Sequence, residues 1–239
     1  MLIGTTNIAS HHGKQHTVVF SHNAISNESE WGSFCAAPFF DRNRIGFKEW
    51  TVTVVVKDAG REAIIADCSA ILSLLAGAVD LTLDGFSHKF RGILTRHDRK
   101  ENAPRRYHML ELTFEGYEYG TVITVNGNSV KSFSVSNTGN LPSPCVIEIT
   151  PTVGAASITL KGVCRDSNTG ADLPVKIANL ESGKKIVIDG LSGLITQDGK
   201  QKGGDVDIWA LPSMKPGKNT ITVDNDKMNI TIKTTPLFM

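Results

Sequence analysis

The sequence predicts a mainly β fold in two domains: an N-terminal antiparallel β domain with one α-helix over residues 1–134, and a C-terminal antiparallel β-sandwich over residues 135–239. Three observations support this prediction. Only residues 61–76 repeat apolar side chains with the 3.6-residue period of a helix. Many short runs alternate apolar and polar residues instead, as strands do. In the second half these runs follow one another closely, with turn residues between them, which is typical of a sandwich.

Composition indicates a globular protein without a marked preference for charged partners. The chain has 239 residues, of which 40% are hydrophobic and 21% are charged, and its formal net charge is +1. This balance favours neither a nucleic acid nor a membrane as the main partner. No run of about 18 apolar residues is present, and residues 1–6 lack the features of a signal peptide. We therefore expect the chain to be made and folded in a cytosol.

The first 30 residues are polar and contain four of the seven histidines, which are His11, His12, His16 and His22. Such a cluster could bind a metal ion. However, no acidic residue or cysteine is near it in the sequence before Glu28. We therefore predict no metal site, and we expect a looped or arm-like segment around a short strand at residues 17–20.

The strongest strand pattern of the first half precedes its one helix. Residues 47–56 are β-branched, aromatic and mostly alternating. The helix at 61–76 presents a single apolar stripe, and Gly77 is a natural stop after it. The stripe consists of Ile64, Ile65, Cys68, Ile71, Leu72 and Leu75. We expect the stripe to cover one face of a sheet, and a docking surface for a partner is the alternative.

A basic cluster lies between two further predicted strands, residues 88–94 and 107–114. Residues 96–106 contain five Lys or Arg against two acidic residues. As a hairpin tip, this segment could bind phosphate, contact another subunit, or simply be solvated. The neutral total charge and the lack of interleaved aromatic residues favour a protein contact over nucleic acid. The candidate interface residues are Arg96, Arg99, Arg105 and Arg106.

The second half consists of predicted short strands without a helical pattern, and we place the domain boundary beside the loop at 137–144. Pro216 and Gly217 predict a tight turn, because Pro presets φ and Gly accepts a positive φ. After this turn, residues 219–223 alternate as in a half-buried strand. Trp209 is the one tryptophan of this half, and its alternation with Leu211 predicts a core position.

Residue patterns that would indicate catalysis or a cofactor are absent or weak. The chain has no Gly-rich phosphate loop and no Gly-x-Ser-x-Gly motif. The carboxylate pairs Asp205/Asp207 and Asp224/Asp226 lack the further oxygen ligands of a calcium loop, so we expect exposed turn residues. The cysteines have no zinc or redox spacing, and we expect small buried thiols at Cys35, Cys68, Cys145 and Cys164. We predict no catalytic residue, no cofactor and no metal.

The order of segments resembles the distal tail proteins of long-tailed, non-contractile bacteriophages and prophages over nearly the whole chain. The run Leu112-Thr-Phe-Glu-Gly-Tyr-Glu-Tyr119 resembles the last strand of the family's ring-forming domain. The run Asn137-Thr-Gly-Asn140, followed by Pro144-Cys-Val-Ile-Glu-Ile149, is similar to the entry into its second domain. Three later segments resemble the family's galectin-like sandwich: 186–190, 209–221 and 230–238.

This resemblance implies a structural virion protein, not an enzyme. It implies a homohexameric ring, possibly stacked, that joins the tail tube to the tail-tip or baseplate proteins, with DNA only passing through the lumen. Its location would be the distal end of the phage tail, after assembly in the bacterial cytoplasm. Two alternatives stay open at this point. One is a carbohydrate-binding, lectin-like module that attaches to a host saccharide, and the other is a hydrolase of cell-wall polymer, which needs two positioned carboxylates.

Overall fold

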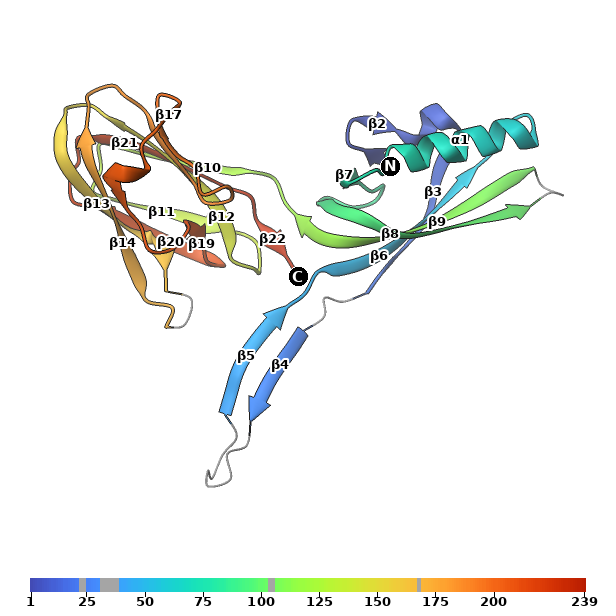
Figure 1. The fold of residues 1–239 in the computed structure, drawn as a ribbon, viewed down its shortest axis with the longest axis horizontal. Coiled ribbons are helices and arrows are strands. Elements are labelled where there is room, and N and C mark those ends of the chain that lie inside the picture. The colour runs from blue at the N-terminus through green and yellow to red at the C-terminus, as the bar shows by residue number, and fades with distance from the viewer. Residues whose placement is uncertain (22–24, 31–38, 103–105, 167–168) are drawn as a thin grey trace. The chain divides into compact units, whose positions relative to one another are not determined.

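The computed structural model describes residues 1–21, 25–30, 39–102, 106–166 and 169–239, and for residues 25–30 and 39–44 it describes the backbone only. The chain forms two compact units, Met1–Tyr119 together with Met239, and Gly120–Phe238 (Figure 1). Strands dominate both units, so the predicted mainly β fold is confirmed. No helix in the described residues is long and apolar enough to cross a membrane.

The first unit is built on one antiparallel sheet with the strand order β2-β1-β7-β8-β9-β6-β3. Alternation explains its core, because Trp50, Val52 and Val54 of β6 all point to the buried face. The strands are β1 (Leu2–Ile3), β2 (Thr6–Asn7), β3 (Gly13–Phe20), β6 (Lys48–Val56), β7 (Ala78–Thr82), β8 (Lys89–Asn102) and β9 (Tyr107–Tyr119).

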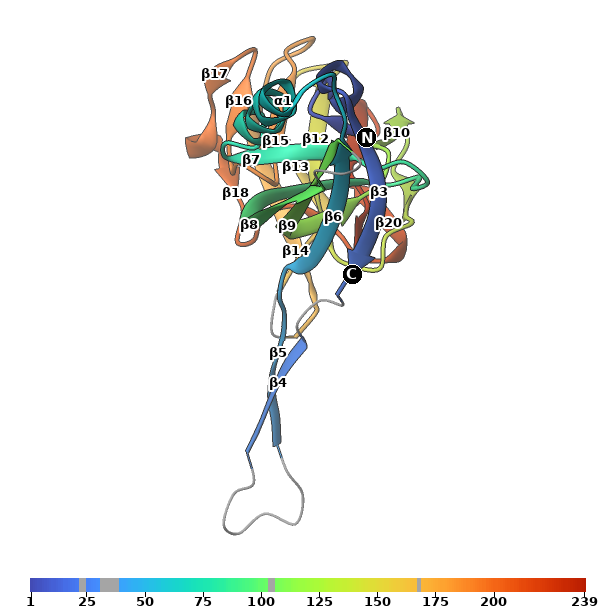
Figure 2. The same cartoon turned by 90° about the vertical axis from the view of Figure 1, so that its right-hand side faces the viewer.

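Helix α1 (Arg61–Ser73) covers this sheet, as its apolar stripe predicts. Ile64, Cys68 and Ile71 are buried in the same core as residues of β6 and β9. Figure 2 shows the helix and these strands from a second side. The helix ends three residues before the predicted position 76, in a turn that Gly77 closes with φ 94°. The prediction that the stripe packs on the sheet is therefore confirmed.

The prediction of an arm-like N-terminus is wrong for residues 1–20. These residues form β1, β2, the 3-10 helix η1 (Ile8–His11) and β3, and β1 and β3 pair with β7 and β6. The physical reason is apolar burial, because Met1, Ile3 and Ile8 belong to the first core. A separate two-stranded antiparallel sheet, β4 (Ile25–Glu30) with β5 (Phe39–Ile45), comes between β3 and β6 in the sequence and was not predicted.

The second unit contains two antiparallel sheets that share one hydrophobic core, so the predicted sandwich is confirmed. The seven-stranded sheet consists of β10 (Ile123–Asn128), β21 (Met228–Thr234), β12 (Ser143–Pro151), β15 (Ile186–Asp189), β16 (Ile195–Gln197), β17 (Lys200–Gln201) and β19 (Ser213–Met214). The five-stranded sheet consists of β11 (Ser132–Asn137), β20 (Gly217–Val223), β13 (Ala155–Arg165), β14 (Asp172–Leu180) and β18 (Val206–Asp207). The short elements η3 (Gly203–Asp205) and β22 (Leu237–Phe238) complete the unit.

The division between the units differs from the predicted boundary at residue 135. Residues 120–134 belong to the second unit, because β10 pairs with β21 and β11 pairs with β20. The turn before β20 follows the prediction, since Gly217 has φ 79° and Asn219, Ile221 and Val223 are buried in alternation.

Candidate functional site

The predicted basic hairpin is a long two-stranded ribbon rather than a loop. Strand β8 continues to Asn102 and β9 begins at Tyr107, so most of the basic cluster lies within β8. The register pairs Arg99 with Leu110 and, after a bulge that follows Leu94, Arg96 with Thr113. Arg105 lies outside the described residues, and the structure therefore does not test that candidate.

Arg96 and Arg99 point to opposite faces of this ribbon. Directly paired residues share a face of a sheet, and Leu110, the partner of Arg99, is buried beneath α1. Arg96 shares its face with Lys100, whose ammonium lies 2.8 Å from Glu111 and 3.9 Å from Asp98. Within the described part of the chain, neither Arg96 nor Arg99 forms an ion pair. The arginines are exposed but do not form a single patch.

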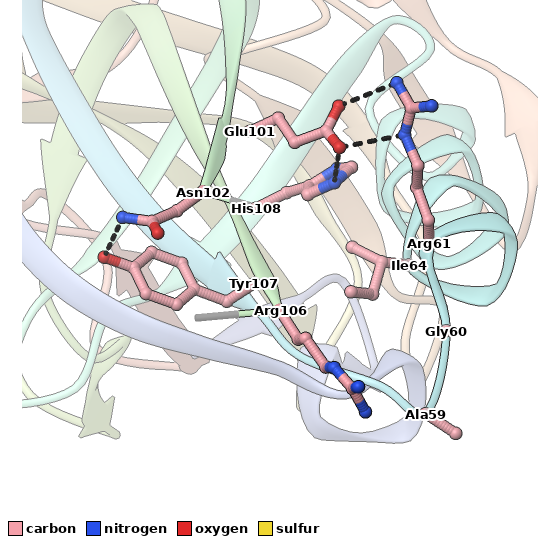
Figure 3. A pocket seen from close by; sticks show the side chains of 9 residues that line it. All are labelled: Ala59, Gly60, Arg61, Ile64, Glu101, Asn102, Arg106, Tyr107 and His108. Carbon is pink, nitrogen blue, oxygen red and sulfur yellow. Dashed lines mark hydrogen bonds and ion pairs between the residues drawn. The ribbon is translucent and has the colours of Figure 1, made fainter. Parts of the chain in front are cut away.

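A cavity of about 370 Å³ lies between the start of α1 and the end of the β8–β9 ribbon (Figure 3). The first turn of α1 lines this cavity, and Gly60, which precedes it, offers no capping side chain, so the positive end of the helix dipole is not capped by a side chain there. Arg106 lines it from the ribbon end, where its φ of 51° is left-handed. The lining residues are Ala59, Gly60, Arg61, Ile64, Glu101, Asn102, Arg106, Tyr107 and His108.

An ion pair joins the helix to the ribbon across this cavity. The Arg61 Nε atom lies 2.8 Å from Glu101 Oε1, and Arg61 Nη2 donates to Glu101 Oε2 at 3.0 Å. This two-point contact fixes the side chain of Glu101 (Figure 3). His108 is buried, its Nε2 lies 3.9 Å from Glu101 Oε1, and its Nδ1 has no hydrogen-bond partner among the described residues. The cavity is therefore lined by positively charged and hydrogen-bond-donating groups, and Arg61 balances the charge of its one carboxylate. This lining suits the docking of an acidic group.

An exposed apolar surface in the second unit corrects the prediction for Trp209. Its side chain is 81% exposed, and Leu191, Leu194 and Leu211 are exposed as well. The chain at 190–193 lies beside 211–212: a Cβ on Gly193 would lie 3.7 Å from Leu211, and one on Gly190 would overlap the Pro212 carbonyl oxygen. We call Leu191, Leu194, Trp209 and Leu211 the Trp209 surface. The sequence did not predict it, because Trp209 was expected in the core.

In each carboxylate pair, one aspartate accepts a hydrogen bond from another segment of the second unit. Asp205 accepts hydrogen bonds from Lys202 Nζ at 3.0 Å and Asn179 at 2.8 Å, and these two contacts, Lys202 first, lower the pKa of Asp205. Asp224 accepts the Thr159 backbone N–H at 3.0 Å. Asp207 lies in β18, and Asp205 and Asp226 are only partly exposed, so the expectation of exposed turn residues holds for Asp224 alone.

Comparison of the sequence finds no matching family model and no matching curated protein. Comparison of the structure finds the crystal structure of Dit from phage SPP1, described as a paradigm of the hub adsorption apparatus of phages that infect Gram-positive bacteria. That match has a TM-score of 0.79 at 14% identity and covers 100% of this chain and 98% of that chain. Two phage p2 baseplate structures in the activated conformation, with Ca and with Sr, match with TM-scores of 0.53 and 0.52 at 8% and 9% identity. They cover 97% and 95% of this chain, and 92% of theirs in both cases.

Proposed function

We propose that this chain, which has the fold of SPP1 Dit, is a structural distal tail protein of a long-tailed, non-contractile phage. Six copies would form a ring, possibly stacked, that joins the tail tube to the tail-tip or baseplate proteins. The chain would be assembled in the bacterial cytoplasm and reside at the distal end of the tail. The observation that carries this proposal is the structural match to SPP1 Dit, which covers 100% of this chain and 98% of that chain and therefore includes both units.

The chemistry of the cavity beside α1 supports a docking role better than catalysis. The cavity beside α1 holds its one carboxylate, Glu101, in a two-point contact with Arg61, so it lacks a free pair of carboxylates. We therefore propose a non-enzymatic role. The hydrolase alternative would be revived by measurable turnover of purified host cell wall.

The ring is tested by the mass of the purified protein together with electron micrographs. A hexamer would have six times the chain mass of 25.8 kDa in light scattering, and stained particles would be rings with sixfold symmetry. A protein that stays monomeric at concentrations of about 10⁻⁵ M, and that forms no ring with its tail-tube partner, would contradict the proposal.

We propose that the β8–β9 ribbon contacts neighbouring subunits or tail proteins through Arg96, Arg99, Arg105 and Arg106, with Arg96 and Arg99 on opposite faces of the ribbon. In a ring, the contact is heterologous, so the ribbon of one copy meets a different face of the next. Arg106 lies beside the positive end of α1, and an acidic side chain of a neighbour would complement both. DNA passing through the ring must slide, and a basic lumen would retain it through phosphate contacts.

Charge reversal of Arg105 and Arg106 to Glu tests this contact. We expect ring or tail assembly to fail while circular dichroism and the melting temperature of the chain stay unchanged. Lys218→Glu, at an exposed position of the second unit, is the matched control and should assemble normally. Normal assembly of the double variant, with loss of a salt-sensitive DNA affinity present in the parent, would favour nucleic-acid binding instead.

A second candidate function is saccharide binding, and the exposure of Trp209 favours it. Lectins commonly stack a sugar ring on an exposed aromatic side chain, and Trp209 is 81% exposed. The apolar neighbours Leu191 and Leu211 are less typical of a sugar site, which also needs polar groups. Titration of host wall polysaccharide, followed by isothermal titration calorimetry, distinguishes the two. Saturable binding that Trp209→Ala abolishes would support the lectin function, and its absence would leave a protein-docking surface.

A further inference from the structure

The chain just after η1 meets two segments from much later in the sequence, the residues that precede α1 and α1 itself. The 3-10 helix η1 ends at His11, and the next residue, His12, turns the chain with a left-handed φ of 52°. The His12 backbone N–H donates to the Ala9 carbonyl at 3.1 Å. Asp58 precedes α1, and Asp67 lies within it. The backbone N–H of Lys57 donates to the His12 carbonyl at 3.3 Å, which ties the first two segments together.

The side chains of His12, Asp58 and Asp67 converge on one point. His12 Nδ1 lies 2.9 Å from Asp67 Oδ2 and 3.6 Å from Asp58 Oδ2. One potential ligand atom from each residue lies within 4.8 Å of the other two. His11 is adjacent, with its Nδ1 4.0 Å from Asp67 Oδ1. A tetrahedral zinc ion with bonds of about 2.0 Å holds its ligand atoms about 3.3 Å apart. The two distances from His12 Nδ1 lie on either side of this value.

We propose that His12, Asp58 and Asp67 form a zinc site, with His11 or a water molecule as the fourth ligand. Zinc is bound by His nitrogen and by Asp oxygen in four-coordinate geometry. Calcium takes six to eight oxygen ligands, and magnesium requires an octahedron of mainly oxygen ligands, so neither ion matches this set. Imidazole suits zinc and other transition metals rather than calcium or magnesium, which agrees with a zinc site.

The surroundings hold the ligands in place without using all their atoms. Asp58 Oδ1 accepts the Ala59 backbone N–H at 2.6 Å, which leaves Oδ2 directed at His12. The Asp67 carboxylate is 17% exposed, whereas the His12 ring is 55% exposed, so the ion would bind on an accessible rim and still contact the helix. Without metal, His12 forms an ion pair with the two carboxylates when its ring is protonated. Zinc would displace that proton, and its binding would weaken at acidic pH.

Bound zinc would fasten η1 and the segment before α1 to the helix. Because the ligands come from three segments, the unfolded chain cannot present this arrangement, and zinc would stabilise the folded first unit by mass action. This inference does not depend on the proposed role in a phage tail, since it concerns only the fold of one unit.

Zinc titration of the full chain, without an affinity tag and after removal of metal with a chelator, tests the site. We expect one zinc ion per chain by calorimetry and a rise in melting temperature with ZnCl₂. His12→Asn should weaken binding at least tenfold, because loss of even an outer-shell partner typically costs 10–100-fold. Asn tolerates the left-handed conformation at this position, so the backbone is preserved.

A second ligand variant and a matched control keep the test decisive. Asp67→Asn preserves shape and should weaken zinc binding in the same way. His16→Asn removes an exposed histidine of β3 from the same unit and should bind like the parent. The proposal is overturned if the parent shows no saturable binding at about 10⁻⁴ M zinc. It is also overturned if His12→Asn and Asp67→Asn, both folded, bind zinc as tightly as the parent.

Discussion

Trp50 in β6 of the first unit and Trp209 between β18 and β19 of the second unit have opposite environments. Trp50 is 1% exposed, and its ring centroid lies 5.4 Å from that of Phe90 and 5.6 Å from that of Phe114. Gly92 in β8 leaves room for it, because a Cβ there would lie 2.7 Å from the Trp50 ring. Trp209 is 81% exposed. A large aromatic side chain is buried only where other strands provide a matching space.

The difference also shows what decides which side of an apolar run is buried. Polar residues flank Trp50, since Glu49 and Thr51 occupy the alternate positions, and they decide which face is buried. In the run from Ile208 to Leu211 all four residues are apolar, so both faces of the run are apolar. The sequence pattern therefore does not indicate which face is buried. Ile208 and Ala210 pack against the core, and Trp209 with its neighbour Leu211 points outward.

The largest expected effect is at Trp50. Trp50→Ala should lower the free energy of unfolding by about 3–5 kcal/mol, because it leaves a cavity among Phe90 and Phe114. Urea unfolding followed by far-ultraviolet circular dichroism measures this without relying on the removed fluorophore. A loss below about 1 kcal/mol would show that the aromatic cluster collapses around the gap and contributes little.

A smaller but still large effect is expected in α1, which supplies the other wall of the first core. Ile71 is fully buried, so Ile71→Ala should cost about 2–5 kcal/mol, whereas Leu72 is half-buried and should cost less. Thermal and urea unfolding of both variants gives the ranking. If both unfold like the parent, the stripe would be a partner surface and the assignment of the first core would be wrong.

The fold was predictable where local pattern and burial agree, as in the stripe of α1 and the alternation of β20. It was not predictable where a short segment depends on distant residues. Ile3 and Ile8 are too few to form a periodic pattern, yet both are buried: Ile3 pairs with Leu81 of β7, and Ile8 shares the core with residues of α1. The boundary shift has the same origin, because β10 and β11 pair with β21 and β20 from the end of the chain.

The candidate site was predictable in composition but not in geometry. The sequence identified the basic cluster, but the bulge after Leu94 and the register determine that Arg96 and Arg99 point to opposite faces. The His12 cluster was rejected because no acid is near it in the sequence, although Asp58 and Asp67 meet it in space. One sequence signal could have indicated a polar partner for His12: Asp67 is an acidic residue within the predicted helix, directly before the buried stripe residue Cys68.

A small dependence of the melting temperature on pH is expected from the polar edge of α1, where His12 contacts Asp67. No such dependence is expected from the Trp209 surface, which has no titratable side chain. The hydrogen bond to Asp67, followed by the charge of Asp58, raises the pKa of His12 above its usual 6.5. A raised folded pKa means that this contribution is complete below about pH 6.5 and is lost as pH rises through the folded value. We expect the melting temperature in chelator to fall over that window.

Asp67→Asn tests this effect, because it removes the contact that contributes most to the raised pKa of His12. The other titratable groups beside His12, Asp58 and His11, stay in place. The fall in melting temperature above pH 6.5 should be reduced in this variant and unchanged in His16→Asn. An identical pH profile for Asp67→Asn and the parent would show that the His12 contact does not contribute to stability.

The smallest expected effect is at Trp209, and it depends on the protein concentration. In the isolated chain, Trp209→Ala should change the free energy of unfolding by less than about 0.5 kcal/mol, because an exposed side chain loses little contact with water on folding. If the Trp209 surface is covered in an assembly, the parent should melt at a higher temperature as concentration rises, and the variant should show less of this increase. Val153→Ala, at an exposed apolar position of the same unit, is the control and should behave like the parent. A loss above about 1 kcal/mol in the dilute monomer would mean that Trp209 packs within its own chain in solution, and the contrast with Trp50 would then fail.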